Sequence, residues 1–244
     1  MNLITTVTRE TFDVVEAQRL RYKVFGEEMG ARLPSAAGGM DVDRFDVHCA
    51  HLLVREGREG RVVACARLLD AADAMAAGGF YSQQEFDLTR TLTLSGRILE
   101  VGRTCVAKDM RTGATLSALW SGLAQEALAR GADHLIGCAS VPFDPETETL
   151  GKLRESMKAY WAPEELRVYP RRPVPRDAED ASRDAALPPL LAAYLRLGAR
   201  VGGEPSWDPE FGVADFFVIV DVRKLAARYA RRFLGNVREE ACVS

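Results

Sequence analysis

Histidine and paired cysteines are scarce in this chain, which narrows the chemistry open to it. The 244 residues include three histidines and five cysteines, and no Cys-x-x-Cys pair occurs among them. His48, Cys49 and His51 form the only Cys/His cluster, but side chains alternate along an extended segment, so this cluster would be split between two faces. Cys105 and Cys138 lie in apolar, strand-like contexts without a neighbouring histidine base. We therefore expect no metal site, and reduced, buried cysteines.

The sequence also lacks long apolar runs and a large net charge. No stretch approaches the roughly 20 apolar residues of a membrane-spanning helix, and the N-terminal region lacks the basic-then-apolar pattern of a signal peptide. A net charge of -3 argues against a general nucleic-acid binder. With 47% hydrophobic residues, the chain can bury a sizeable core. We expect one cytoplasmic domain over residues 1–244, and peripheral contact with the inner membrane face stays open.

Hydrophobic periodicity predicts a mixture of helices and strands. Helices are expected at 11–30, 113–131, 150–161 and 190–197, and strands at 51–55, 61–69, 97–107, 134–140 and 215–221. The middle of the chain would form a β-α-β unit. Residues 162–186 are expected to be a loop-rich insertion. Residues 222–235 are expected to form a basic helix that either packs on the sheet or lies on anionic lipid.

Two opposite charges interrupt the apolar strand expected at 97–107. On a regular strand, Glu100 and Arg103 would face opposite sides. Gly102 lies between them, and a glycine inside a strand often marks a β-bulge, which would bring both charges to one face and free a backbone N–H. That arrangement suits a polar cleft. The alternative is a buried Glu–Arg ion pair that only fixes the strand.

The turn after this strand has the character of an anion site. Arg111, Gly113 and Ala114 precede or open the next helix. Small residues let the backbone approach a phosphate closely, and the helix N-terminus favours negative charge. The alternative is an ordinary tight turn. Because the turn lies directly after the strand that holds Glu100, phosphate binding is the favoured interpretation.

Three aspartates, Asp41, Asp43 and Asp46, follow a loop rich in glycine and proline. Acidic side chains here could hold a cationic substrate, or they could orient Arg21 and Arg67, which lie near apolar stripes of neighbouring elements. A solvated loop with turn caps is the alternative. The spacing does not match a calcium-binding loop.

Taken together, these segments resemble a known family. The turn at 111–114 is similar to a degenerate acyl-carrier-binding loop of the GNAT superfamily. Segments 20–25, 43–46, 79–82, 85–86, 99–103, 119–120 and 194–199 look like those of ornithine Nα-acyltransferases, which make lyso-ornithine lipid. Several of them also resemble acyl-homoserine-lactone synthases. The resemblance implies an α/β (α+β) GNAT-like fold: a mixed, mostly antiparallel central sheet flanked by helices, with a β-α-β acyl-carrier-binding core.

The resemblance also implies a reaction and a site. A 3-hydroxyacyl thioester on acyl-carrier protein would be attacked by the α-amine of ornithine, with no permanently bound cofactor. Glu100 would act as the base, a freed N–H near Gly102 as the oxyanion donor, and Arg103 would bind the substrate carboxylate or organise the cleft. The implied substrate-binding residues are Arg21, Asp43, Asp46, Arg67 and Phe80, and the implied phosphopantetheine-binding residues are Arg111, Gly113 and Ala114.

Other functions remain open at this point. The chain could acylate glutamine or glycine, make acyl-homoserine lactones, or transfer acetyl groups from coenzyme A. A non-enzymatic acyl-carrier or lipid-binding protein is a further alternative. The basic side chains between 152 and 176 offer a docking surface for an acidic carrier protein, and a solvated face is the other interpretation.

Overall fold

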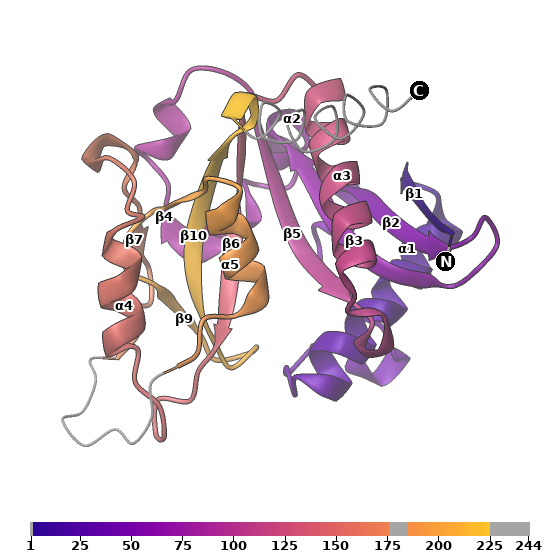
Figure 1. Ribbon diagram of the computed structural model, residues 1–244, viewed down its shortest axis with the longest axis horizontal. Helices are drawn as coiled ribbons and strands as arrows, with labels where there is room; N and C mark the ends of the chain where they lie inside the picture. The colour runs from indigo at the N-terminus through magenta and orange to yellow at the C-terminus, as the bar shows by residue number, and fades with distance from the viewer. Residues whose placement is uncertain (1, 176–184, 225–244) are drawn as a thin grey trace, which may run out of the picture.

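The computed structural model, which describes residues 2–175 and 185–224, is built around one central sheet (Figure 1). The strand order is β1-β2-β3-β5-β6-β10-β8, with β9 also paired to β10. The strands are β1 Leu3–Thr8, β2 Ala50–Glu56, β3 Val62–Asp70, β5 Ile98–Val106, β6 His134–Pro142, β8 Arg200–Val201, β9 Ser206–Asp208 and β10 Val213–Asp221. A separate two-stranded sheet pairs β4 Phe86–Asp87 with β7 Tyr169–Pro170.

Helices cover both faces of this sheet (Figure 1). They are α1 Thr11–Arg21, α2 Ala71–Ala76, α3 Gly113–Ala129, α4 Gly151–Lys158 and α5 Pro189–Arg196. A π-helix, Tyr22–Glu28, continues α1. Short 3-10 helices lie at Ala36–Gly38, Asp46–His48, Tyr81–Gln84, Thr91–Thr93, Lys108–Met110 and Glu164–Leu166. None of the described helices is long and apolar enough to cross a membrane.

The sheet is mostly antiparallel, as the family resemblance implied. Every pairing in it is antiparallel except β5 with β6. Because β5 and β6 run parallel, the connection between them must cross over, and α3 provides it. The predicted β-α-β unit is therefore confirmed.

The parallel strands β5 and β6 are paired over a short distance only. The pairing runs from Ile98 with His134 to Glu100 with Ile136. At the next position of β6, a Cβ on Gly137 would lie 2.3 Å from the carbonyl oxygen of Val101, so only glycine permits this approach. Beyond this point β5 and β6 no longer pair with each other, although each still pairs with its other neighbour. These separated parts of the two strands border the cavity described below.

A β-bulge interrupts β5, as predicted from the charges on this strand. Gly102 pairs with Arg67 and Cys105 pairs with Cys65, so Arg103 and Thr104 lie opposite a single residue of β3. The residue in the left-handed region is Arg103, with φ of 49°, and not the neighbouring glycine. Holding a non-glycine residue there is unfavourable and is typical of positions with a functional role.

Some predicted boundaries were wrong. The first helix begins at Thr11 as predicted, but it continues as a π-helix that ends at Glu28 and not at residue 30. The edge strand β1 and the short strands β4, β7, β8 and β9 were not predicted, because two to six half-buried residues carry little periodicity. The expected insertion contains β7, and its residues 176–184 lie outside the described part of the chain. Of the expected basic helix at 222–235, only residues 222–224 are described, and they are helical.

Candidate active site

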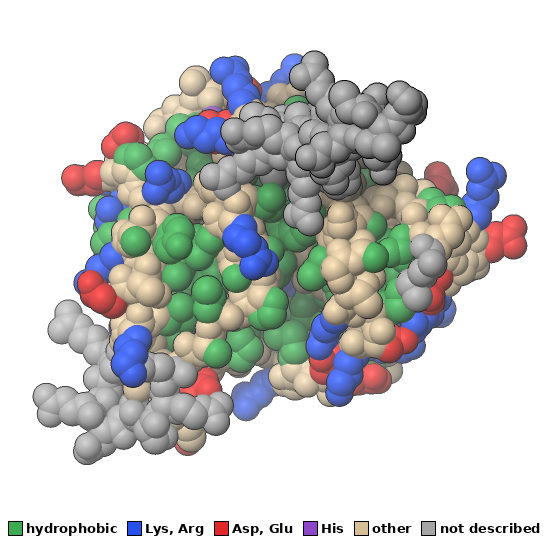
Figure 2. All heavy atoms as spheres, viewed as in Figure 1, with side chains coloured by type: hydrophobic (Ala, Val, Ile, Leu, Met, Phe, Trp, Pro, Cys, Tyr) green, Lys and Arg blue, Asp and Glu red, His purple; other side chains and the backbone are tan. Residues whose placement is uncertain are grey.

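A cavity of about 510 Å³ lies beside the bulged part of β5. Its walls come from β5, β6, β10, α3, the segment leading into α5, and the π-helix. Hydrophobic side chains gather around a hollow between α5 and α3 (Figure 2). Tyr194 of α5 packs edge-on against Trp120 of α3, with ring centroids 4.8 Å apart, and so bridges the two sides. Such a cavity suits a long apolar ligand with a few polar contacts.

Glu100 is a buried carboxylate that lines this cavity, with 3% of its surface exposed. Its Oε2 accepts the N–H of Tyr81 at 2.6 Å, and its Oε1 accepts the N–H and the hydroxyl of Ser82 at 2.8 and 2.6 Å. Burial raises the pKa of Glu100 and outweighs the opposing effect of these three donors. The carboxyl group is thus both fixed in place and a stronger base than an exposed glutamate.

Arg103 lines the same cavity, so the bulge brings both charges of β5 to it. The two do not form the ion pair that was the alternative prediction. Arg103 instead pairs with Asp41 at 3.1 Å and Asp43 at 3.2 Å. Its guanidinium also lies 4.8 Å from the ring centroids of both Tyr81 and Phe211, which is cation–π geometry.

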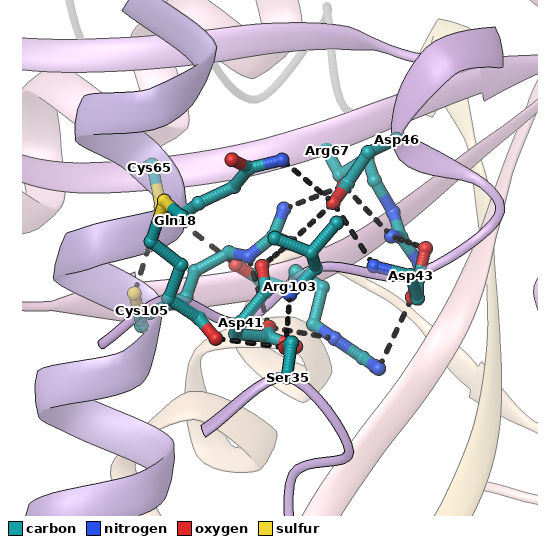
Figure 3. Close-up of polar contacts among 12 residues, drawn as sticks. Gln18, Ser35, Asp41, Asp43, Asp46, Cys65, Arg67, Arg103 and Cys105 are labelled. Atoms are coloured by element: carbon teal, nitrogen blue, oxygen red, sulfur yellow. Dashed lines mark hydrogen bonds and ion pairs between the residues drawn. The ribbon is translucent and has the colours of Figure 1, made fainter. Parts of the chain in front are cut away.

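The three aspartates of the 41–46 loop form a closed ionic network with three arginines (Figure 3). Arg21 binds Asp41 at 2.9 Å and Asp46 through two bonds of 2.8 Å. Arg67 binds Asp43 at 2.6 Å and Asp46 at 3.1 Å. Three positive charges therefore face three negative charges. Except for Asp43 and Arg103, these side chains are almost fully buried.

The network holds its charges strongly. Burial opposes ionisation of Asp46, but hydrogen bonding and attraction to Arg21 prevail and lower its pKa well below the usual range. The pKa of Asp43 is lowered in the same way, chiefly by Arg67 and Arg103 acting against burial. In the described part of the chain, the cavity-lining residues include none of Arg21, Asp43, Asp46 and Arg67. Their position fits organisation of the cleft, through Arg103, and not direct contact with a substrate.

Phe80, the remaining predicted substrate-binding residue, belongs to the core. It is 5% exposed and belongs to the smaller of two hydrophobic clusters, which also contains Phe45 and Phe86. The residues that follow it, Tyr81 and Ser82, line the cavity instead. The cavity-facing residues of this segment are thus one and two positions further along than Phe80.

The predicted phosphate-binding residues lie at the start of α3. Thr112 is its N-cap, and the Thr112 hydroxyl accepts the N–H of Thr115 at 3.2 Å. Gly113 and Ala114 are exposed in the first turn, where helix N–H groups have no acceptor within the helix. Arg111 lines the cavity, but both of its terminal nitrogens bind Glu28, at 2.5 and 2.8 Å. The turn is thus exposed, with its arginine held by a carboxylate.

Comparison with known proteins places this arrangement in a family. A chain from Rhizobium meliloti (strain 1021), named L-ornithine N(alpha)-acyltransferase, is 35% identical over 93% of this chain and 83% of its own length. A chain of the same name from Brucella abortus (strain 2308) is 37% identical over 87% of this chain and 82% of its own length. This chain belongs to the L-ornithine Nα-acyltransferase family. Residues 20–121 also match the model of the acetyltransferase (GNAT) domain.

Solved structures agree with the fold of this family member. An N-acyl amino acid synthase from uncultured soil microbes is 8% identical, with a TM-score of 0.55 over 93% of this chain and 95% of its own. A CoA-dependent acyl-homoserine lactone synthase is 19% identical, with a TM-score of 0.53 over 94% of this chain and 89% of its own. These similarities confirm the predicted GNAT-like fold.

The thiol that lines the cavity of this acyltransferase, that of Cys138, is a poor nucleophile, in line with the sequence prediction. Cys49, Cys65, Cys105 and Cys138 are free, and Cys242 lies outside the described residues. Cys138 lines the cavity, 3.4 Å from the Ser82 hydroxyl, but burial raises its pKa well above that of an ordinary thiol. A thiol that stays protonated cannot readily form an acyl-enzyme.

The cavity contains a second acidic group that was not predicted from the sequence. Glu85, Asp208 and Asp215 each have one carboxylate oxygen in this group, and these oxygens lie within 4.8 Å of one another. All three line the cavity that holds Glu100. Glu85 follows the 81–84 turn, Asp208 is the last residue of β9, and Asp215 lies in β10. Because they come from separate elements, no local spacing in the sequence connects them. The one signal in the sequence was Asp215 at the start of an otherwise apolar strand.

Proposed function

We propose that this acyltransferase transfers a (3-hydroxy)fatty acyl group from acyl-carrier protein to the α-amine of ornithine, giving lyso-ornithine lipid. The observation that carries the proposal is the position of Glu100, a fixed, buried carboxylate of raised pKa in the wall of a largely apolar cavity. The cavity suits an acyl chain, and the carboxylate suits an amine that must lose a proton before it can attack. The names of the relatives supply ornithine as the amine.

The reaction needs a base because an α-ammonium group is mostly protonated at neutral pH. Glu100, directly or through one water molecule, accepts that proton. The free amine then forms a bond to the thioester carbonyl carbon. When the resulting tetrahedral species collapses, the C–S bond breaks, the nitrogen gives up its second proton, and the phosphopantetheine sulfur leaves as a thiol. General base catalysis of this kind contributes typically ~10²–10⁴-fold to the rate.

The bulge supplies the second requirement, a donor for the charge that develops on the thioester oxygen. A β-bulge leaves a residue of the strand outside the regular ladder, so a backbone N–H near Gly102 is the proposed donor. Arg103 is proposed to bind the carboxylate of the amino acid from the same wall. Arg21, Arg67, Asp43 and Asp46 then hold Arg103 and the 41–46 loop in position.

The proposed donor is acyl-carrier protein, with its phosphopantetheine phosphate at Arg111, Gly113 and Ala114. The N–H of Thr115 is already bonded to Thr112, which leaves fewer donors for the larger diphosphate of coenzyme A. Carrier proteins are generally acidic. The basic side chains Lys152, Arg154, Lys158, Arg171 and Arg172 are the proposed docking surface, although Arg154 and Lys158 already pair with Glu204 and Glu155.

One assay tests the reaction as a whole. The protein is given a 3-hydroxyacyl carrier protein, or the matching acyl-coenzyme A, together with ornithine, glutamine, glycine or S-adenosylmethionine, and products are identified by mass. We expect N-acyl-ornithine as the main product, formed faster from the carrier protein. An acyl-homoserine lactone, or an amide of glutamine or glycine formed in preference to ornithine, would replace the proposal. Absence of any amide would overturn it.

A second experiment tests the base. Glu100→Gln should lower kcat by about 10²-fold or more, because an amide cannot accept the proton. Since Glu100 also binds Tyr81 and Ser82, the matched variant is Ser82→Ala, which removes one of these hydrogen bonds and keeps the carboxylate. We expect Ser82→Ala to retain activity within about tenfold, because the N–H groups of Tyr81 and Ser82 still hold the carboxylate and one hydrogen bond typically contributes about 0.5–1.5 kcal/mol. Equal losses in both variants would assign Glu100 a positioning role.

A further inference from the structure

The carboxylates of Glu85, Asp208 and Asp215 converge on the cavity without a matching positive charge. Within the described residues, they are the one group of three or more His, Cys, Asp or Glu side chains with the geometry to surround a cation. Arg103 is the basic side chain that acts on both Glu85 and Asp215, but it is already paired with Asp41 and Asp43. The cluster therefore has an excess of acceptors and of negative charge.

A second observation shows that this cluster is incomplete. The Oε2 atom of Glu85 is buried and accepts no N–H or hydroxyl group in the described part of the chain, and the Glu85 side chain lies within hydrogen-bond reach only of another carboxyl group, that of Asp215. A buried carboxylate oxygen without a donor is costly, and native proteins rarely leave one in that state. The neighbouring acceptors are partly occupied. Asp215 accepts the Ser140 hydroxyl at 2.6 Å, and one oxygen of Asp208 accepts the N–H groups of Glu210 and Phe211 at 2.8 and 3.1 Å.

The electrostatics of the cluster also favour a cation, because its negative charges are unfavourable beside one another. Burial raises the pKa of Asp215 to about 6, with the charge of Asp208 acting in the same direction. Burial and the charge of Asp215 raise the pKa of Glu85 well above that of an ordinary glutamate. A cationic group placed among these carboxylates would remove the repulsion between them and supply the missing donors.

We propose that Glu85, Asp208 and Asp215 bind the side-chain ammonium group of the acceptor amino acid and so select a diamino acid. This proposal rests on ornithine being the acceptor. An ammonium carries three N–H donors, which matches three converging carboxylates. The Glu100 carboxylate lines the same cavity and would receive the α-amine, while Ser82, bonded to Glu100, lies between Glu100 and Cys138. One amine is thus directed to the base and the other to the acidic cluster.

The test compares ornithine with 2-aminopentanoic acid, which is ornithine without its side-chain amine. The wild-type protein should prefer ornithine by about 10²-fold or more in kcat/KM, since a site built for a charged partner rejects the analogue that lacks it. Asp215→Asn and Glu85→Gln should each reduce that preference to about tenfold or less, mainly through the KM for ornithine. The KM for the acyl donor should not change. Asp221→Asn, at the other end of the same strand, is the matched control and should behave as wild type.

Several results would overturn the proposal. Equal rates with the two amines in the wild type would show that the side-chain ammonium is not recognised. If Asp215→Asn and Glu85→Gln lowered kcat/KM equally for ornithine and for 2-aminopentanoic acid, the cluster would serve the chemistry or the fold and not recognition of the side chain. Loss of activity on treatment with EDTA, restored by a divalent metal ion, would make the cluster a metal site. Failure of the proposed function itself looks different, because no ornithine amide would form in the wild type.

Discussion

Two groups of three carboxylates each contain members that interact with Arg103, and the groups differ in how their charge is balanced. Asp41, Asp43 and Asp46 face three arginines and are largely closed off from the cavity. In the second group, Arg103 acts on Glu85 and Asp215, and all three carboxylates, with Asp208, line the cavity. Similar acidic side chains thus serve different purposes: one group fixes the structure, and the other is left incomplete for a ligand.

The pKa shifts have opposite directions in the two groups. The arginines hold the pKa values of Asp43 and Asp46 below their usual range, against the effect of burial. In the open group, burial and mutual repulsion raise those of Glu85 and Asp215. The first group should therefore stabilise the fold at neutral pH, and the second should destabilise it until a cation binds.

The largest expected effect comes from breaking the balanced group. Arg21→Met should lower the free energy of unfolding by about 3–5 kcal/mol, because Asp41 and Asp46 would lose a fully buried partner. Such a loss is a large part of the ~5–15 kcal/mol that stabilises a typical protein. Urea unfolding followed by circular dichroism measures it.

Arg55→Met is the matched control. Arg55 also pairs with two carboxylates, Asp13 and Glu16, but these lie nearer the surface and are 30% and 24% exposed. We expect a loss of about 1 kcal/mol or less there, as for other surface ion pairs. If Arg21→Met lowered the free energy of unfolding no more than Arg55→Met does, the buried network would not be a main source of stability.

The open group should respond in the opposite sense. Asp215→Asn should raise the stability of the ligand-free protein at pH 8 by roughly 1–3 kcal/mol, because it removes a charge whose ionisation is disfavoured in the folded state. The pKa of Asp215 is about 6 in the folded protein, against an ordinary value of 3.8 for an aspartate. The folded state thus loses stability as pH rises between these values, and the gain in the variant should shrink as pH falls through them. Asparagine can still accept the Ser140 hydroxyl.

Urea unfolding at pH 8 and pH 5 measures this gain, with Asp221→Asn as the control on the same strand. A destabilised Asp215→Asn protein at pH 8 would contradict the idea that the group is unbalanced. A gain of equal size at both pH values would show that the effect has nothing to do with ionisation.

Much of the fold and part of the site could be predicted from sequence because the signals there are local. The spacing of Glu100, Gly102 and Arg103 was enough to predict the bulge, which the structure confirms at Arg103. The turn at 111–114 could be placed in the same way, between a strand and an amphipathic helix. Local patterns of this kind report directly on backbone geometry.

The open acidic group could not be predicted because its members meet only in the folded chain. Glu85, Asp208 and Asp215 lie on separate segments more than a hundred residues apart at the extremes. Phe80 was misassigned for a related reason: its sequence gives no sign of which neighbour in the 79–82 segment turns to the core and which to the cavity. That choice depends on Glu100, which binds the N–H groups of Tyr81 and Ser82.

The smallest expected effect on stability concerns Arg111, outside both acidic groups. Its ion pair with Glu28 is partly exposed, so Arg111→Ala should change the free energy of unfolding by less than about 1 kcal/mol. If Arg111 binds the phosphate of the acyl donor, however, it must leave Glu28 to do so. Arg111→Ala should then raise the KM for the donor several-fold, and Glu28→Gln, which releases the arginine, should lower it. The KM for ornithine should stay constant in both variants. If Glu28→Gln instead raised the donor KM, as Arg111→Ala does, this competition would be refuted. A Glu28 carboxylate that only positions Arg111 would be needed for donor binding, whereas one that competes with the phosphate would hinder it.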